Sequence, residues 1–227
     1  MDADVNQHEF HDGTDLDVGA AIFVLALREK GIRNTPVLRA MEQVPRELFA
    51  PQRFRDLSRT DVALPLPCGQ TMTGPTTIAL MLSALDVQPG HSVLEVGTGS
   101  GYVSALLAQM GAKVTTVERY EQLSESAQER IKISGHEQYI SLEVGDGLAT
   151  RLRGTKYDRI LLNGSGLAIP QTMTNLLSDG AKLVGALTLE GFPRLVKIVK
   201  QEKGTLHQEL GAPLRLSPLV NKDTISS

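Results

Sequence analysis

The sequence predicts an α/β fold with a mostly parallel sheet, and three observations support this prediction. Through the middle of the chain, short apolar segments typical of buried strands alternate with amphipathic segments typical of helices. One of these strands runs directly into a glycine-rich loop and a helix, at residues 93–110. Towards the end, apolar segments at 195–200 and 206–210 flank Lys203-Gly204 and predict an antiparallel hairpin. We therefore expect a parallel sheet that a late hairpin extends.

Helices precede the glycine-rich loop. Residues 18–30 and 35–44 predict two helices that are rich in apolar side chains, and residues 76–85 place apolar side chains on one face of a third. We expect the first two helices to form an N-terminal helical cap over the sheet. A loose polar tail at residues 1–15 is expected to precede them.

The remaining elements complete the alternation. Further strands are expected at residues 113–117, 139–144, 157–162 and 181–189, and further helices at 122–134 and 170–177. We divide the chain into the tail at 1–15, the helical cap and active-site segment at 16–75, the cofactor-binding core at 76–190, and the hairpin with its tail at 191–227. These parts are expected to form one structural domain.

The glycine-rich loop predicts a site for a nucleotide cofactor. Its glycines let the backbone approach a ligand closely where a strand ends and a helix begins. A dinucleotide site would need a glycine at position 102, where this chain has Tyr102. The pattern Glu95-x-Gly97-x-Gly99-x-Gly101 is instead typical of enzymes with a Rossmann-like methyltransferase fold that use S-adenosylmethionine (SAM), which carries no phosphate. The alternative is an ordinary turn between a strand and a helix.

Two acidic residues close the next two predicted strands. Glu118 stands at the carboxyl end of the strand that follows the glycine-rich loop, where such folds place the acid that binds ribose hydroxyls. A carboxylate can accept two hydrogen bonds from these hydroxyls. Asp146, between Gly145 and Gly147, could accept a hydrogen bond from an adenine amine. The alternatives are a solvated loop charge for Glu118 and a plain turn for Asp146.

The composition argues against several other functions. The formal net charge is −3, tryptophan is absent and aromatic residues make up 4% of the 227 residues, which argues against nucleic-acid binding. No apolar run approaches the roughly 18 residues of a membrane span, and the acidic start lacks a signal-peptide profile. The lone Cys68 excludes an internal disulfide. All of this favours a cytoplasmic protein. We expect no metal site, because His8 and His11 fall in the loose tail.

Three segments carry a further pattern. They are Val37-Leu38-Arg39-Ala40-Met41-x-x-Val44-Pro45-Arg46-Glu47-x-Phe49, then Asp61-x-Ala63-Leu64-Pro65 followed by Gly69-Gln70-Thr71-Met72-Thr73-x-Pro75, and finally residues 93–102. With residues 215–220, they resemble one family, the protein-L-isoaspartate O-methyltransferases, over about residues 18–220. The resemblance implies an enzyme that methylates the free α-carboxylate of L-isoaspartyl residues in damaged proteins. The ester then cyclises to a succinimide, which reopens partly to aspartate.

The resemblance also implies roles for particular residues. Thr73 matches the position of the family's active-site hydroxyl, where serine is usual. The alternative is that Thr73 caps the helix that follows. Residues expected to hold SAM, and its product S-adenosylhomocysteine, are Gln70, Thr71, Glu95, Gly97, Thr98, Gly99, Ser100, Gly101, Tyr102, Glu118, Arg119, Asp146, Gly147 and Asn163. Residues expected to contact the isoaspartyl peptide are Asp61, Leu64, Pro65, Leu216 and Ser217.

A carboxylate acceptor needs no general base, since it is already ionised at neutral pH. This agrees with the sequence, which has no His–Asp or Cys–His pair near the motifs. We interpret Cys68 as a small buried hydrophobic residue rather than a nucleophile. We expect a monomer and leave a dimer open.

The second half of the chain departs from the family pattern. After the fourth strand, Asn163-Gly164-Ser165-Gly166 replaces a usual Thr-Ala-Ala and is expected to be more flexible and more polar. After the fifth strand, residues 186–188 replace a usual Pro-Val-Gly. Because this half helps to form the acceptor side, two alternatives stay open. One is a SAM methyltransferase for another peptide or small-molecule acceptor, and the other is a SAM-binding protein without catalysis.

Overall fold

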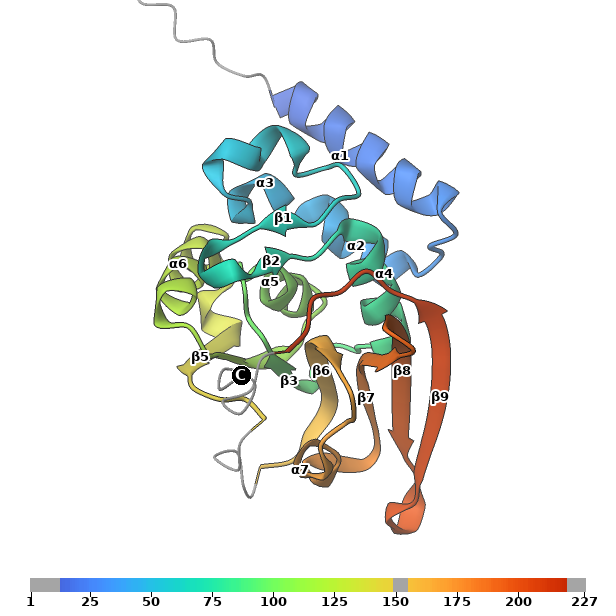
Figure 1. Cartoon of the computed structure of the whole chain (residues 1–227). Coiled ribbons are helices and arrows are strands. Elements are labelled where there is room, and N and C mark those ends of the chain that lie inside the picture. Colours follow the sequence, from blue (N-terminus) through green and yellow to red (C-terminus); the bar gives the residue numbers. More distant parts are fainter. Residues whose placement is uncertain (1–12, 149–154, 220–227) are drawn as a thin grey trace, which may run out of the picture.

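A seven-stranded sheet forms the centre of the computed structural model, which describes residues 13–148 and 155–219 (Figure 1). The strand order is β5-β4-β3-β6-β7-β8-β9. The strands are β3 (Ser92–Val96), β4 (Lys113–Glu118), β5 (Ile140–Val144), β6 (Tyr157–Gly166), β7 (Leu177–Leu189), β8 (Phe192–Lys200) and β9 (Leu206–Pro213). The strands β5, β4, β3, β6 and β7 run parallel to one another, and β8 and β9 continue the sheet as an antiparallel hairpin. The predicted α/β fold with a late hairpin is confirmed.

Helices and apolar cores cover both faces of the sheet. Helices α4 (Pro75–Leu85), α5 (Tyr102–Gln109) and α6 (Glu121–Ile133) contribute to a core on one face, and α7 (Gln171–Asn175) contributes to a core on the other. Successive strand residues alternate between these cores, as the pleat requires: Val93 belongs to the first and Leu94 to the second. Because both faces are covered, the carboxyl-terminal edge of the parallel strands is the natural place for a site.

The N-terminal residues form the predicted helical cap. It consists of α1 (Gly13–Glu29), α2 (Thr35–Gln43), α3 (Arg46–Phe49) and the 3-10 helix η1 (Gln52–Leu57). A small antiparallel ribbon of β1 (Leu64–Pro65) and β2 (Thr71–Met72) then leads into α4, and both lie between the cap and the large sheet (Figure 1). Among the described residues, no helix combines the length and apolarity that crossing a bilayer requires.

Three predicted boundaries differ from the structure. Helix α1 begins at Gly13, inside the stretch 1–15 that was expected to be a tail. Strand β6 continues to Gly166, so the segment 163–166 is not a flexible loop; Ser165 and Gly166 pair with β7. Helix α7 is only five residues long, and β7 already begins at Leu177. The first part of the expected tail, with His8 and His11, lies outside the described residues.

Gly101 offers a test of how α5 and α6 pack. Its φ is 86°, and an added Cβ would lie 3.2 Å from both Ala127 Cβ and Ile131 Cγ1 on α6. We expect Gly101→Ala to lower the free energy of unfolding by about 2–4 kcal/mol, through backbone strain and overpacking together. Gly135→Ala is the matched control, because Gly135 has a φ of 76° with open space around it. The control should lose only the strain, about 1–2 kcal/mol in urea unfolding. Equal losses in the two variants would contradict the packing argument.

Candidate functional site

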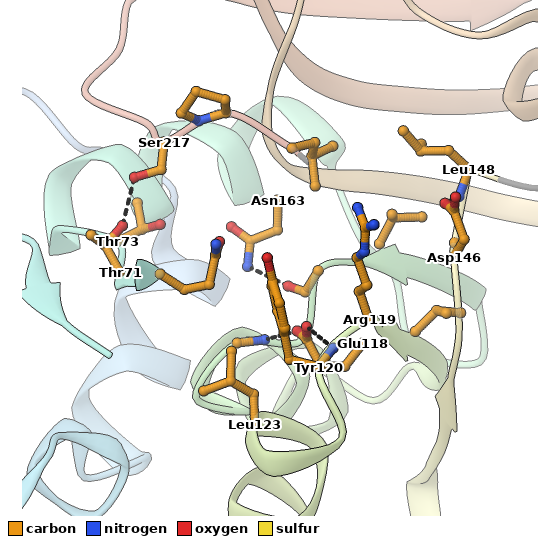
Figure 2. A pocket seen from close by; sticks show the side chains of 18 of the residues that line it. Thr71, Thr73, Glu118, Arg119, Tyr120, Leu123, Asp146, Leu148, Asn163 and Ser217 are labelled. Carbon is orange, nitrogen blue, oxygen red and sulfur yellow. Dashed lines mark hydrogen bonds between the residues drawn. The ribbon is translucent and has the colours of Figure 1, made fainter. Parts of the chain in front are cut away.

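A cleft lies at the carboxyl ends of β3, β4, β5 and β6. Figure 2 shows its side chains, with Thr71, Thr73 and Ser217 on one side of the view and Asp146 and Leu148 on the other. The residues that line it are Gln70, Thr71, Thr73, Val96, Gly97, Gly99, Val117, Glu118, Arg119, Tyr120, Leu123, Gly145, Asp146, Gly147, Leu148, Asn163, Leu216, Ser217, Pro218 and Leu219. The cleft therefore joins six separate stretches of the chain, from Gln70 to Leu219.

The glycine-rich loop builds the floor of the cleft. Gly97, Gly99 and Gly101 all have positive φ, of 93°, 56° and 86°, a conformation that other residues adopt only with strain. The chain can therefore turn sharply from β3 into α5 without placing a side chain over the strand ends. The backbone N–H of Gly97 is tied to the carbonyl of Val117 at 2.9 Å, which fixes the loop against β4. Gly97 and Gly99 line the cleft, whereas Gly101 packs against α6.

Glu118 ends β4 with its carboxylate on the glycine-rich loop. Its Oε2 accepts a hydrogen bond from the backbone N–H of Gly99 at 2.8 Å, and its Oε1 accepts one from the N–H of Tyr120 at 3.0 Å. The residue is 5% exposed, so it is not a solvated loop charge. Each carboxylate oxygen can accept a second hydrogen bond, which leaves Glu118 able to bind two hydroxyls.

Asp146 repeats this arrangement at the end of β5. Its Oδ1 accepts a hydrogen bond from the N–H of Leu148 at 3.0 Å, so the residue does form the turn that was considered as an alternative, and it also lines the cleft. Gly147 is required beside it, because an added Cβ would lie 2.8 Å from Val96 Cγ1. Both acids therefore bind the N–H two residues later, and both of those residues, Tyr120 and Leu148, line the cleft.

Glu95 lies beneath the cleft and is fully buried. Its carboxylate accepts hydrogen bonds from Ser104, from Thr116 at 2.9 Å and from the side-chain amide of Asn163 at 3.4 Å. Burial raises the pKa of Glu95 to about 7 and the charge of Glu118 adds to the rise, while the three hydrogen bonds oppose it. The amide of Asn163 also donates to the carbonyl of Gly97 at 3.0 Å, so Glu95 and the loop share one orienting residue.

Hydroxyl groups form the opposite wall. Thr73 is 8% exposed and lines the cleft, and beside it the hydroxyls of Thr71 and Ser217 are hydrogen-bonded at 2.8 Å (Figure 2). Thr73 is not the cap of α4, because the N-cap residue is Gly74. The carboxylate of Asp61 binds the backbone N–H of Thr76 at 2.9 Å instead. The hydroxyl of Thr73 is therefore available to a ligand.

Residues 214–219, which we call the C-terminal strap, follow β9, and the last four of them line the cleft. The strap leaves β9 and runs back over the sheet towards β3 (Figure 1). Two backbone hydrogen bonds join the strap to Ser165. The N–H of Ser165 donates to the carbonyl of Ser217 at 2.9 Å, and the carbonyl of Ser165 accepts from the N–H of Leu219 at 2.8 Å. Gly164 allows this approach, since an added Cβ would lie 2.5 Å from Leu219 Cγ. The polar segment 163–166, at the end of β6, is therefore the anchor of the strap.

Several predicted site residues lie outside the cleft lining. Tyr102 is buried against Phe49 and Arg46, with ring centroids 5.5 Å apart for the aromatic pair. Asp61 forms an ion pair with Lys30 at 2.5 Å in addition to binding Thr76. The other predicted residues that the lining does not include are Leu64, Pro65, Glu95, Thr98, Ser100 and Gly101.

The interpretation of Cys68 as a buried residue is wrong: it is exposed, with a φ of 58°, in the turn between β1 and β2.

Several residues that line the cleft were not predicted. Tyr120 and Leu148 carry a signal that could have identified them, because each follows a strand-end acid by two residues. Apolar residues of the strap gave no such signal. The missed lining residues are Val96, Val117, Tyr120, Leu123, Gly145, Leu148, Pro218 and Leu219.

Comparison with known proteins gives a consistent result. Residues 20–224 match the family model described as protein-L-isoaspartate(D-aspartate) O-methyltransferase. The protein-L-isoaspartate O-methyltransferase of Xanthobacter autotrophicus is 42% identical over 199 residues, which cover 87% of this chain and 90% of that protein. The protein of the same name from Dictyoglomus turgidum is 38% identical over 193 residues, or 85% and 87% of the two chains.

A solved structure supports the fold independently. It is a protein-L-isoaspartate O-methyltransferase from Plasmodium falciparum in complex with S-adenosyl-L-homocysteine. It superposes with a TM-score of 0.76, covers 88% of this chain and 97% of its own, and is 21% identical. At this identity the likeness concerns the fold alone.

The raised pKa of Glu95 predicts a pH-dependent stability. Between its usual pKa of 4.5 and the folded value of about 7, the unfolded chain releases a proton that the folded protein keeps. The contribution of this group to the free energy of unfolding is therefore full below pH 4.5 and is lost as pH rises towards 7. Glu95→Gln cannot titrate and should show a flatter stability profile across this window, measured by urea unfolding at a series of pH values. Glu125→Gln, an exposed change on α6, is the control. Parallel profiles for Glu95→Gln and the control would rule out the proton uptake.

Proposed function

The chain belongs to the protein-L-isoaspartate(D-aspartate) O-methyltransferase family, and from this premise we propose how its cleft performs the reaction. The enzyme is a SAM-dependent methyltransferase that esterifies the free carboxylate of L-isoaspartyl residues in damaged proteins or peptides. One observation carries the proposal for the site. A glycine-rich loop with two strand-end acids faces a hydroxyl-lined wall across one cleft, and the strap lines the same cleft.

The residues of the cleft fit the chemical groups of SAM. The two oxygens of Glu118 can each accept one more hydrogen bond, as a ribose diol requires. Asp146 can accept from an adenine amine, and Leu148 offers apolar surface to the purine. The left-handed turn at Gly97 and Gly99 leaves room for a ligand against the backbone. When bound, SAM supplies the electrophilic methyl group and leaves as S-adenosylhomocysteine.

The hydroxyl wall is proposed to hold the acceptor. An isoaspartyl carboxylate is ionised at neutral pH and attacks without a general base, so the protein must position it rather than activate it. Thr73 can donate one hydrogen bond to the carboxylate oxygen that does not react. The paired hydroxyls of Thr71 and Ser217 join β2 to the strap at this wall.

The partners and compartment follow the same reasoning. The substrate is proposed to be an isoaspartyl polypeptide, as membership of the family implies, and the enzyme is proposed to act as a monomer. We propose a cytoplasmic location, where an exposed thiol such as that of Cys68 stays reduced.

The role of Glu118 can be measured directly. Glu118→Ala removes the acceptor for the ribose hydroxyls and should weaken SAM binding by about 1–3 kcal/mol, measured by isothermal titration calorimetry. Glu121→Ala, an exposed change in the first turn of α6, is the control and should bind SAM normally. An unchanged affinity in a folded Glu118→Ala protein would remove Glu118 from the site.

The role of Thr73 is tested by removing its hydroxyl at constant shape. Thr73→Val should slow methyl transfer to an isoaspartyl peptide by about 10- to 1000-fold, the usual cost of losing one positioned donor. Thr73→Ser should keep the activity. Ser83→Ala, which removes a buried hydroxyl on α4, should leave transfer unchanged. A fully active Thr73→Val enzyme would exclude a part for the hydroxyl in catalysis.

A further inference from the structure

A second cavity, of about 510 Å³, opens beside the cleft at the ends of β6 and β7. Its lining is mainly apolar and includes no charged residue among the described part of the chain. It consists of Leu148, Leu162, Gly164, Ser165, Gly166, Leu167, Ala168, Ile169, Pro170, Ala186, Thr188, Pro218 and Leu219. The reaction as derived above does not use this cavity.

The cavity has a buried floor and an exposed rim. Leu162 and Ala186, from β6 and β7, are 2% and 1% exposed. Leu167 at the rim is 86% exposed, the highest value among the large apolar residues of the described chain. An apolar side chain held in solvent at the mouth of an apolar cavity adds hydrophobic surface that a ligand could cover.

The cavity adjoins the cleft. Leu148, Pro218 and Leu219 line both spaces, so the strap is a shared wall. The hydroxyl of Ser217 contacts Thr71 in the cleft, and the next residue, Pro218, already borders the cavity. Consecutive Cα atoms are 3.8 Å apart, and an extended peptide advances about 3.3 Å per residue. A polypeptide whose carboxylate lies at the hydroxyl wall can therefore reach the cavity within about three residues.

We propose that this cavity binds a large apolar side chain of the acceptor polypeptide, within about three residues of the isoaspartyl residue. The inference rests on the proposed function, which makes a polypeptide the ligand of the adjoining cleft. The described residues of the lining carry no charge to pair with an acidic or basic side chain, and burying an unpaired charge is costly. The cavity thereby gives the enzyme a preference among damaged sites that all present the same carboxylate.

The experiment uses SAM and a set of isoaspartyl peptides, each at least seven residues long, that differ at one position. Leucine, phenylalanine, serine or aspartate is placed in turn at each of the three positions on either side of the isoaspartyl residue, and kcat/KM is measured. At one or more of these positions we expect leucine or phenylalanine to exceed serine by about 10-fold or more, the effect of burying one such side chain. Aspartate at the same position should be the poorest substrate.

Variants connect the preference to the cavity. Leu167→Asp places a charge at the rim of the cavity and should reduce the leucine-to-serine ratio to below about 3-fold. Ile133→Asp is the matched control, because Ile133 is 71% exposed at the end of α6 and lies outside both linings. The control should keep the full ratio.

The outcomes separate this inference from its premise. Transfer to all isoaspartyl peptides at equal rates would overturn the apolar subsite and leave the proposed function standing. A preference that persists unchanged in Leu167→Asp would also overturn it. If no isoaspartyl peptide is methylated by an enzyme that binds SAM, the proposed function fails, and the subsite fails with it.

Discussion

The left-handed turn between β3 and α5 is the constraint on which the rest of the site depends. With Gly97, Gly99 and Gly101 at positive φ, the backbone leaves the strand without a side chain over its end. The N–H of Gly99 then faces β4, where Glu118 accepts it, and the close approach at Gly101 seats α5 against α6. A carboxylate that orders the loop and still has free lone pairs can serve structure and ligand binding together. The turn therefore fixes both the shape and the polarity of the cleft.

The fold and the cofactor side of the cleft could be predicted because their signals are local. The strand, the three glycines and the strand-end acids Glu118 and Asp146 lie within short windows whose periodicity is informative. The strap could not be predicted in the same way. Its position depends on hydrogen bonds with Ser165, and these form only when β6 extends further than the polar segment 163–166 suggested. Tertiary pairing overrode local propensity at this point.

Two residues show why a motif does not define a role. Tyr102 belongs to the glycine-rich motif, yet its ring lies against Arg46 and Phe49, so it joins the helical cap to the core. Asp61 belongs to a family segment, yet it caps α4 and pairs with Lys30. Neither residue lines the cleft, and Asp61 acts on the site indirectly, because it fixes the start of the helix that follows Thr73. Side-chain direction decided these roles, and a sequence pattern contains little information about direction.

The hydroxyl pair of Thr71 and Ser217 joins residues that are 146 positions apart in the chain. Closing such a long loop costs chain entropy before any contact is gained, and contacts of large sequence separation slow folding. We therefore expect the wall of the cleft to be completed late in folding, and we expect local opening of the strap at Ser165 to precede opening of the sheet. Amide hydrogen exchange at Leu219 would report this opening separately from the core of the sheet. A partly folded chain with its sheet already formed would still lack the enclosure that catalysis requires, so activity itself marks the fully folded state.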